Sequence, residues 1–86
     1  MKNRGRTEML AAMLEVAKGK VTKTKIMYIA FLSYGQLKEY LSILIENNLI
    51  EYLDGDNKFK TTEKGIHFLK MHNQIEELLQ TTTKNN

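Results

Sequence analysis

The most regular alternation of apolar and polar positions lies in the middle of the chain. Leucine and isoleucine recur there at the spacing of one helical face, at Leu37, Leu41, Leu44 and Ile45. Ser33, with Gln36 three positions later, is typical of a capping-box start for this helix, which we place at residues 34–46. Residues 49–53 and 58–61 then flank an Asp54-Gly55 pair, a strong hairpin signal. The pattern predicts a capped helix that runs directly into a two-stranded hairpin.

Apolar spacing predicts two further helices before this unit, at residues 7–18 and 23–31. Gly19 is suited to end the first of them, and Thr22 is suited to cap the second. Three helices that lead into a hairpin make a winged helix-turn-helix, a mainly α fold with a small β-hairpin that serves in nucleic-acid binding. The residues expected in its core are Leu10, Leu14, Ile26, Leu37, Leu41, Leu44, Leu49, Ile50 and Phe59.

The chain divides into four segments by composition and periodicity. Residues 1–6 are expected to form a flexible basic arm, and residues 7–61 the winged helix-turn-helix domain. Residues 62–80 are expected to form a C-terminal helix that ends near Leu79. Residues 81–86 contain no apolar side chain, so we expect a disordered tail.

The C-terminal helix carries more apolar surface than one small domain can cover. Ile66 and Leu69 lie on a stripe beside a second apolar series, and one of the two stripes is enough to close the core. A second copy of the chain is the simplest cover for the other stripe, so we expect a homodimer. Packing of one wide stripe on the first helix is the alternative. The residues expected to form the dimer contact are Phe68, Met71, Ile75 and Leu78.

Composition excludes several classes of protein, and charge adds a clue to the partner. Eighty-six residues make one small domain, and the absence of cysteine fits a reducing cytoplasm. No apolar run is long enough to cross a membrane. The net charge is only +3, but the first 25 residues hold seven basic and two acidic side chains. Such clustering favours a polyanionic partner, with a lysine-rich solubilising surface as the alternative.

The polar face of the helix at residues 34–46 offers groups that read DNA bases. The amide of Gln36 matches the edge of adenine, and Lys38 reaches guanine or a phosphate. Gln36 serving only as a cap is the alternative, and Glu39 and Glu46 count against a DNA-facing helix. Lysines of the wing and of the second helix are expected at phosphates, and the arm arginines in an adjacent groove. The candidate DNA-binding residues are Arg4, Arg6, Lys23, Lys25, Tyr34, Gly35, Gln36, Lys38, Ser42, Lys58 and Lys60.

Catalytic and metal sites find little support in the sequence. His67 and His72 are five residues apart and therefore do not share a helical face as paired zinc ligands do. Residues 54–57 resemble the opening of a calcium loop, but the later ligands are missing. No nucleophile with an adjacent base is recognisable. We therefore expect no enzyme activity, no cofactor and no small-molecule ligand.

Taken together, these segments resemble a known family, the archaeal winged-helix proteins typified by the 10 kDa chromatin-associated DNA-binding dimers. The resemblance covers residues 6–79 and implies double-stranded DNA as the ligand and an antiparallel pairing of C-terminal helices across a two-fold axis. The C-terminal helix expected here is shorter than in the best-described members. The matching segments are Arg6-Thr-Glu-Met-Leu10, Thr24-Lys-Ile-Met-Tyr28, Leu32-Ser-Tyr34, Tyr40-Leu41, Leu44, Asn48-Leu-Ile50 and Thr61-Thr-Glu-Lys-Gly65.

Two functions follow from this sequence. The first is a double-stranded DNA-binding protein, either a transcription regulator or a chromatin component, located in the cytoplasm and associated with the nucleoid. The alternative is a winged-helix protein-interaction module that does not bind DNA. The acidic residues of the helix at 34–46 favour the module, while the basic arm and wing favour DNA.

Overall fold

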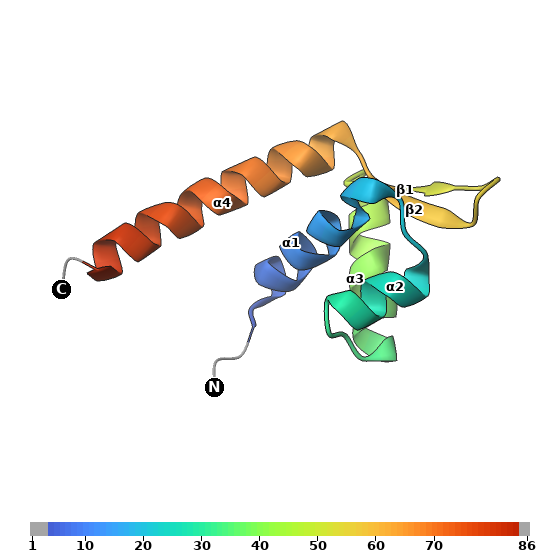
Figure 1. The fold of residues 1–86 in the computed structure, drawn as a ribbon, viewed down its shortest axis with the longest axis horizontal. Coiled ribbons are helices and arrows are strands. Elements are labelled where there is room, and N and C mark those ends of the chain that lie inside the picture. Colours follow the sequence, from blue (N-terminus) through green and yellow to red (C-terminus); the bar gives the residue numbers. More distant parts are fainter. Residues whose placement is uncertain (1–3, 85–86) are drawn as a thin grey trace.

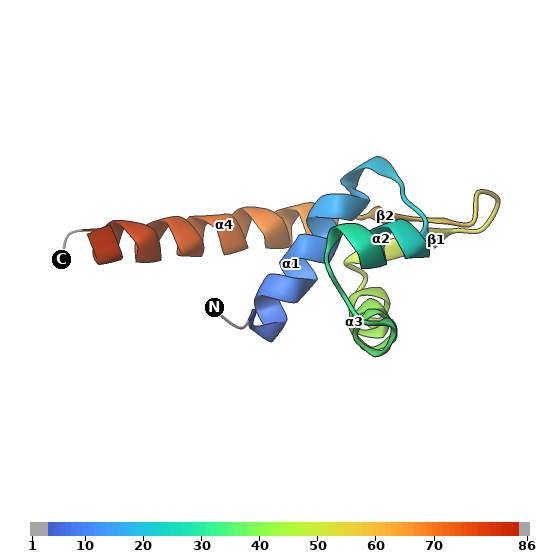
Figure 2. The ribbon, with the colours of Figure 1, turned by 60° about the horizontal axis from the view of Figure 1, so that its bottom comes forward.

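The computed structural model describes residues 4–84, with side chains described for residues 4–79. Three helices cluster together, the hairpin extends from one side of the cluster, and the last helix extends from the other (Figures 1 and 2). The predicted mainly helical fold with a small β-hairpin is confirmed, and no helix of the described part could span a membrane. The elements are α1 (Arg6–Val16), a 3-10 turn η1 (Ala17–Gly19), α2 (Lys23–Ile29), α3 (Tyr34–Glu46), β1 (Ile50–Leu53), β2 (Lys58–Thr61) and α4 (Glu63–Lys84).

The core lies between the three clustered helices and the base of the hairpin. All nine residues expected in the core are buried, joined by Met13, Ala17 and Leu69. The predicted apolar face of α3 was too wide, because Ile45 is 42% exposed. Leu37, Leu41 and Leu44 fill the contact with the other helices. Tyr34 lies before Leu37, the first buried residue of α3, and Ile45 lies on the side of the helix that faces the hairpin.

The hairpin of β1 and β2 forms as predicted, but its turn uses a different residue. The strands pair antiparallel in the register Ile50↔Thr61 to Leu53↔Lys58. The backbone N–H groups of Asp56 and Asn57 both donate to the carbonyl of Leu53, at 3.1 and 2.9 Å. Asn57 holds the left-handed conformation, with φ 59°, whereas Gly55 does not have a positive φ. The conformational freedom needed by this turn is therefore supplied by the asparagine.

Helix α4 is anchored at its start and then leaves the domain. Thr62 caps it, and its hydroxyl accepts a hydrogen bond from the N–H of Gly65 at 3.0 Å. Gly65 and Leu69 are buried against the domain. The helix continues to Lys84, so the expectation of an end near Leu79 and a disordered segment from residue 81 was wrong for residues 81–84. No glycine or proline stops the helix there, and threonine lowers helix propensity by only about 0.5 kcal/mol per residue.

Candidate nucleic-acid interface

The start of α3 is fixed by a reciprocal cap that involves one of the candidate base-reading residues. The hydroxyl of Ser33 accepts from the backbone N–H of Gln36 at 3.1 Å. The amide oxygen of Gln36 accepts from the backbone N–H of Ser33 at 2.9 Å. The predicted capping box is present, and it occupies the oxygen that pairing with adenine requires. While this cap stays closed, the amide oxygen of Gln36 is directed to the backbone of Ser33, and the amide nitrogen is the group placed to reach a base.

The exposed side of the first turns of α3 leaves room for a partner to approach closely. A methyl group added at Gly35 would meet nothing within 4 Å. The ammonium group of Lys38 lies 5.4 Å from the ring centre of the exposed Tyr34, a cation–π contact that orients both side chains. Ser42, further along the helix, is also exposed. No other part of the described chain requires a glycine at position 35, although glycine weakens a helix.

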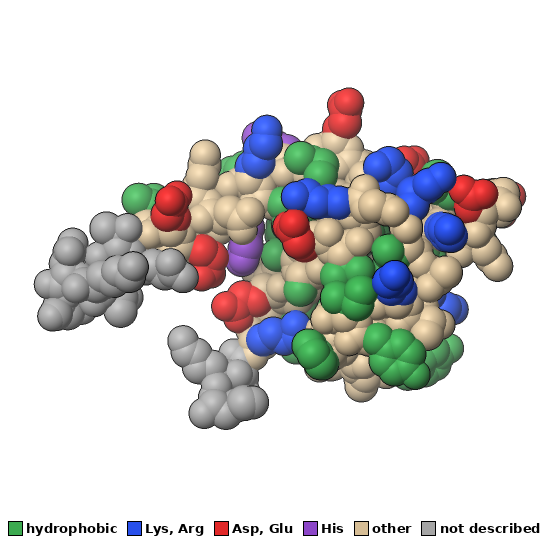
Figure 3. Space-filling view, in the orientation of Figure 1, with side chains coloured by type: hydrophobic (Ala, Val, Ile, Leu, Met, Phe, Trp, Pro, Cys, Tyr) green, Lys and Arg blue, Asp and Glu red, His purple; other side chains and the backbone are tan. Residues whose placement is uncertain are grey.

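The start of α2 contributes two exposed lysines, Lys23 and Lys25. The Thr22 hydroxyl caps this helix by accepting from the backbone N–H of Lys25 at 3.2 Å. The ion pairs found between described residues, Lys18–Glu15 and Lys20–Asp56, do not include either lysine. Figure 3 shows Lys and Arg side chains gathered on the side of the molecule where η1, the start of α2 and the hairpin lie. The cations at the start of α2 are therefore available to an anionic partner.

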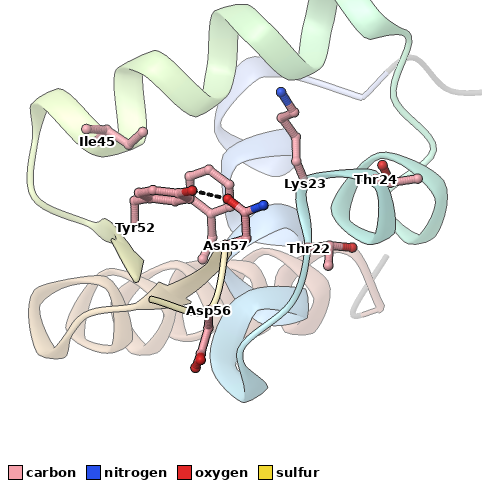
Figure 4. Close-up of a pocket in the computed structure, with 8 residues that line it drawn as sticks. Thr22, Lys23, Thr24, Ile45, Tyr52, Asp56 and Asn57 are labelled. Carbon is pink, nitrogen blue, oxygen red and sulfur yellow. Dashed lines mark hydrogen bonds between the residues drawn. The ribbon is translucent and has the colours of Figure 1, made fainter. Parts of the chain in front are cut away.

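A groove of about 620 Å³ separates α2, α3 and the hairpin. Ile45 and Tyr52 lie next to each other at one side of it, Lys23 lies at the other side, and Asn57 lies between them (Figure 4). The Tyr52 hydroxyl donates a hydrogen bond to the side-chain oxygen of Asn57, and the ring of Tyr52 lies 5.0 Å from that of Phe59. Tyr52 and Asn57 were not among the predicted site residues, and the hairpin turn places them at the groove. Their spacing across a predicted Asp-Gly turn is the signal that marks them as neighbours.

The wing lysines do not point into this groove. Side chains alternate along β2, so Lys58 and Lys60 share the face opposite Phe59, which lines the groove. The ammonium group of Lys60 donates to the backbone carbonyl of Lys18 at 3.2 Å and is directed toward η1. Lys58, beside the turn, has a long flexible side chain and is the wing cation nearest the tip.

The two arginines expected on a flexible arm, Arg4 and Arg6, are part of the folded structure. The guanidinium group of Arg4 donates to the carbonyls of Ala30 and Phe31, at 2.6 and 2.9 Å. These carbonyls lie at the end of α2, where helical partners run out and a cation is favourable. Arg6 is the exposed first residue of α1. The expectation of a flexible arm is wrong for Arg4 and Arg6, and residues 1–3 lie outside the described residues.

The residues expected to form a dimer contact lie along one side of α4. Phe68 is half-buried and stacks on His72, with ring centres 6.4 Å apart. Met71, Ile75 and Leu78 are 50%, 54% and 68% exposed. The exposed apolar stripe is the main unexplained feature of α4.

Within residues 4–79, no group of three or more histidine or acidic side chains is arranged to hold a metal ion.

Comparison with known proteins agrees with this geometry. Residues 3–80 match the family model described as winged helix-turn-helix. The crystal structure of Sso10a-2, a DNA-binding protein from Sulfolobus solfataricus, superposes with a TM-score of 0.77 at 22% identity over 95% of this chain and 92% of that one. Lactococcus lactis ZitR, solved in complex with DNA, superposes with a TM-score of 0.67 at 21% identity over 98% of this chain, which spans 60% of ZitR. No curated protein sequence matches the chain.

Proposed function

The chain belongs to the winged helix-turn-helix family, and from this premise we propose that it binds double-stranded DNA. In this arrangement the first turns of α3 enter the major groove, and the hairpin lies beside it as the wing. Two proteins of similar fold support the proposal, since one is a DNA-binding protein and the other was solved on DNA. The family membership agrees with the resemblance noted in the sequence.

One observation carries the proposal: the start of α3 combines an open glycine with exposed cations. Gly35 leaves space for a DNA backbone or base edge, and Lys38 lies within the same turn. Lys23 and Lys25 flank this surface from the start of α2. Glycine weakens a helix, and the described residues around position 35 leave room for a larger side chain. Such a glycine is expected where another molecule approaches closely.

The contacts divide into those that hold the duplex and those that distinguish bases. Lys23, Lys25 and Lys58 are assigned to phosphates. The amide nitrogen of Gln36 and the ammonium group of Lys38 are assigned to base edges. Pairing of Gln36 with adenine uses both the oxygen and the nitrogen of its side-chain amide, and it therefore requires the cap to open. Tyr34 and Ser42 complete the surface that faces the major groove. We assign Lys60 and Arg4 secondary roles in DNA binding, because both side chains are directed to backbone carbonyls of the protein itself. Arg6 is also assigned a secondary role.

We further propose that the protein acts as a homodimer in the cytoplasm, as a transcription regulator or a chromatin component of the nucleoid. The exposed stripe of Met71, Ile75 and Leu78 supports pairing through α4. A two-fold dimer presents two copies of α3 to the DNA, which suits successive turns of a duplex. The alternative, a protein-interaction module, is favoured only by the exposed carboxylates of Glu39 and Glu46 on α3.

Substitution of Gly35 by alanine tests the proposal without disturbing the fold. We expect Gly35→Ala to leave the free energy of unfolding unchanged or raised, because the added methyl meets nothing and alanine favours a helix. We expect its DNA affinity to fall about tenfold, since a clash of about 1–3 kcal/mol is introduced at the contact. Fluorescence anisotropy with a labelled duplex measures the change.

Gly19→Ala is the matched control for this substitution. Gly19 is also exposed, and a methyl group added there would likewise meet nothing within 4 Å, but it lies in η1, away from α3. We expect this variant to bind DNA as the wild type does. Equal affinities for wild type, Gly35→Ala and Gly19→Ala would remove the start of α3 from the interface.

A further inference from the structure

Three aromatic residues stand out from the protein where α2 passes into α3. Tyr28 is 70% exposed, Phe31 is 83% exposed and Tyr34 is 60% exposed. We call these three residues the aromatic triplet. Phe31 has the highest exposure among the large hydrophobic side chains of the described residues. Figure 3 shows hydrophobic side chains along the lower edge of the molecule, where the end of α2 and the start of α3 lie.

Phe31 occupies a backbone position that suits glycine or asparagine. Its φ is 56°, in the left-handed region that bulky residues avoid. The N–H of Phe31 donates to the carbonyl of Tyr28 at 3.3 Å, and the N–H of Leu32 donates to that of Met27 at 2.9 Å. This pair of hydrogen bonds is the Schellman arrangement that ends many helices, with the left-handed residue usually a glycine.

The end of α3 shows the same arrangement with a residue suited to it. The N–H of Leu49 donates to the carbonyl of Leu44 at 2.9 Å, and the left-handed residue is Asn48, with φ 60°. Asparagine adopts this conformation readily, whereas phenylalanine adopts it only at a cost in free energy. The chain therefore contains two equivalent helix ends, one of which carries a costly residue.

The protein itself makes little use of the Phe31 ring. The side chain is almost fully in solvent, whereas the next residue, Leu32, is 8% exposed and supplies the apolar contact of the helix end. The Arg4 guanidinium holds the turn in place through the carbonyls of Ala30 and Phe31. Strain that is maintained by neighbouring groups and displays a side chain outward is typical of a functional position.

We infer that the aromatic triplet, with Phe31 at its centre, contacts the methyl groups of thymine in the major groove. This inference rests on the proposed DNA binding. The residues at the start of the inserted helix are the ones nearest the base edges, and the triplet precedes and begins α3. The C5-methyl of thymine is the apolar group that the major groove presents, and phenylalanine is suited to contact it. The exposed Lys25 and Lys38 flank the triplet and favour a polyanion over an apolar protein surface.

Removing the methyl groups from the DNA tests the inference. Affinity is measured by fluorescence anisotropy for a short duplex of alternating adenine and thymine and for the same duplex with uracil in place of thymine. We expect the wild type to bind the uracil duplex about fourfold more weakly for each thymine methyl that the triplet covers, from the transfer of one buried methyl group. Phe31→Asn, which copies the residue at position 48, is expected to lose the part of this preference that the central ring supplies, so that its affinities for the two duplexes lie closer together than those of the wild type.

Phe31→Asn also reports on the strain, separately from DNA. Relief of the left-handed conformation is expected to raise the melting temperature by about 5 °C, so a loss of binding cannot be assigned to unfolding. Lys25→Ala is the control for affinity, because removal of a cation from a phosphate is expected to weaken binding to both duplexes by the same factor and to leave their ratio unchanged.

The outcomes separate this inference from the proposed function. A wild-type preference for thymine that is smaller in Phe31→Asn supports the inference. Equal binding of the two duplexes by the wild type, or a preference of the same size in Phe31→Asn as in the wild type, overturns it and leaves DNA binding intact. Absence of binding to either duplex overturns the proposed function together with the inference, and the aromatic triplet would then be a protein contact.

Discussion

Gly65→Ala is expected to destabilise the fold by about 3 kcal/mol, close to the upper range for overpacking in a folded protein. A methyl group at this position would lie far inside van der Waals contact of the carbonyl oxygen of Leu49 and 2.6 Å from Cγ2 of Thr61. That carbonyl cannot withdraw freely, because it accepts the N–H of Thr62 at 3.1 Å. The start of α4 must therefore move away from the end of α3. Chemical denaturation gives the free energy of unfolding.

The control for Gly65→Ala is again Gly19→Ala, whose added methyl has no neighbour within 4 Å. Its effect is expected to stay within about 0.5 kcal/mol, as for most surface substitutions. A comparably small loss in Gly65→Ala would mean that α4 is not packed closely against Leu49.

Ile75→Asp is expected to weaken the proposed homodimer at least about a hundredfold. Ile75 lies between Met71 and Leu78 on the exposed stripe of α4, so each subunit would place one unpaired carboxylate in the contact. Sedimentation analysis measures the dissociation. Asn73→Asp is the matched control, because residue 73 is exposed on the opposite side of the helix and gains the same charge. Wild-type protein that sediments as a monomer at about tens of micromolar would contradict the dimer.

The fold was predictable because local signals and apolar spacing agree along most of the chain. Ser33 and Gln36 form the capping box that their spacing indicates, and the leucines of α3 are buried as their periodicity predicts. Asn48 follows the end of α3, where asparagine accepts the left-handed conformation. The same conformation at Phe31 was not predictable, because the tertiary contacts of Arg4 and Leu32 hold it in place.

The candidate interface was less predictable, because side-chain direction depends on competing partners. The sequence cannot tell that the oxygen of Gln36 is taken by a cap, or that Lys60 turns to the carbonyl of Lys18. Arg4 was assigned to a free arm because no local pattern points to the carbonyls at the end of α2, 26 residues away. In contrast, Gly35 and the lysines of α2 are exposed, as their positions on the polar face of each helix predict.

The salt dependence of DNA binding tests the central claim most directly. Each phosphate neutralised by a cation lowers the slope of log K against log salt by about 0.9, so the phosphate contacts assigned to Lys23, Lys25 and Lys58 predict a slope of about −2.7 or steeper for the wild type on a duplex. Lys25→Ala is expected to reduce the steepness by about one unit. Lys70→Ala, which removes the same charge from the exposed side of α4, is expected to leave the slope unchanged. Binding that is absent at low salt, or that does not change with salt, would contradict the assignment of this protein to DNA.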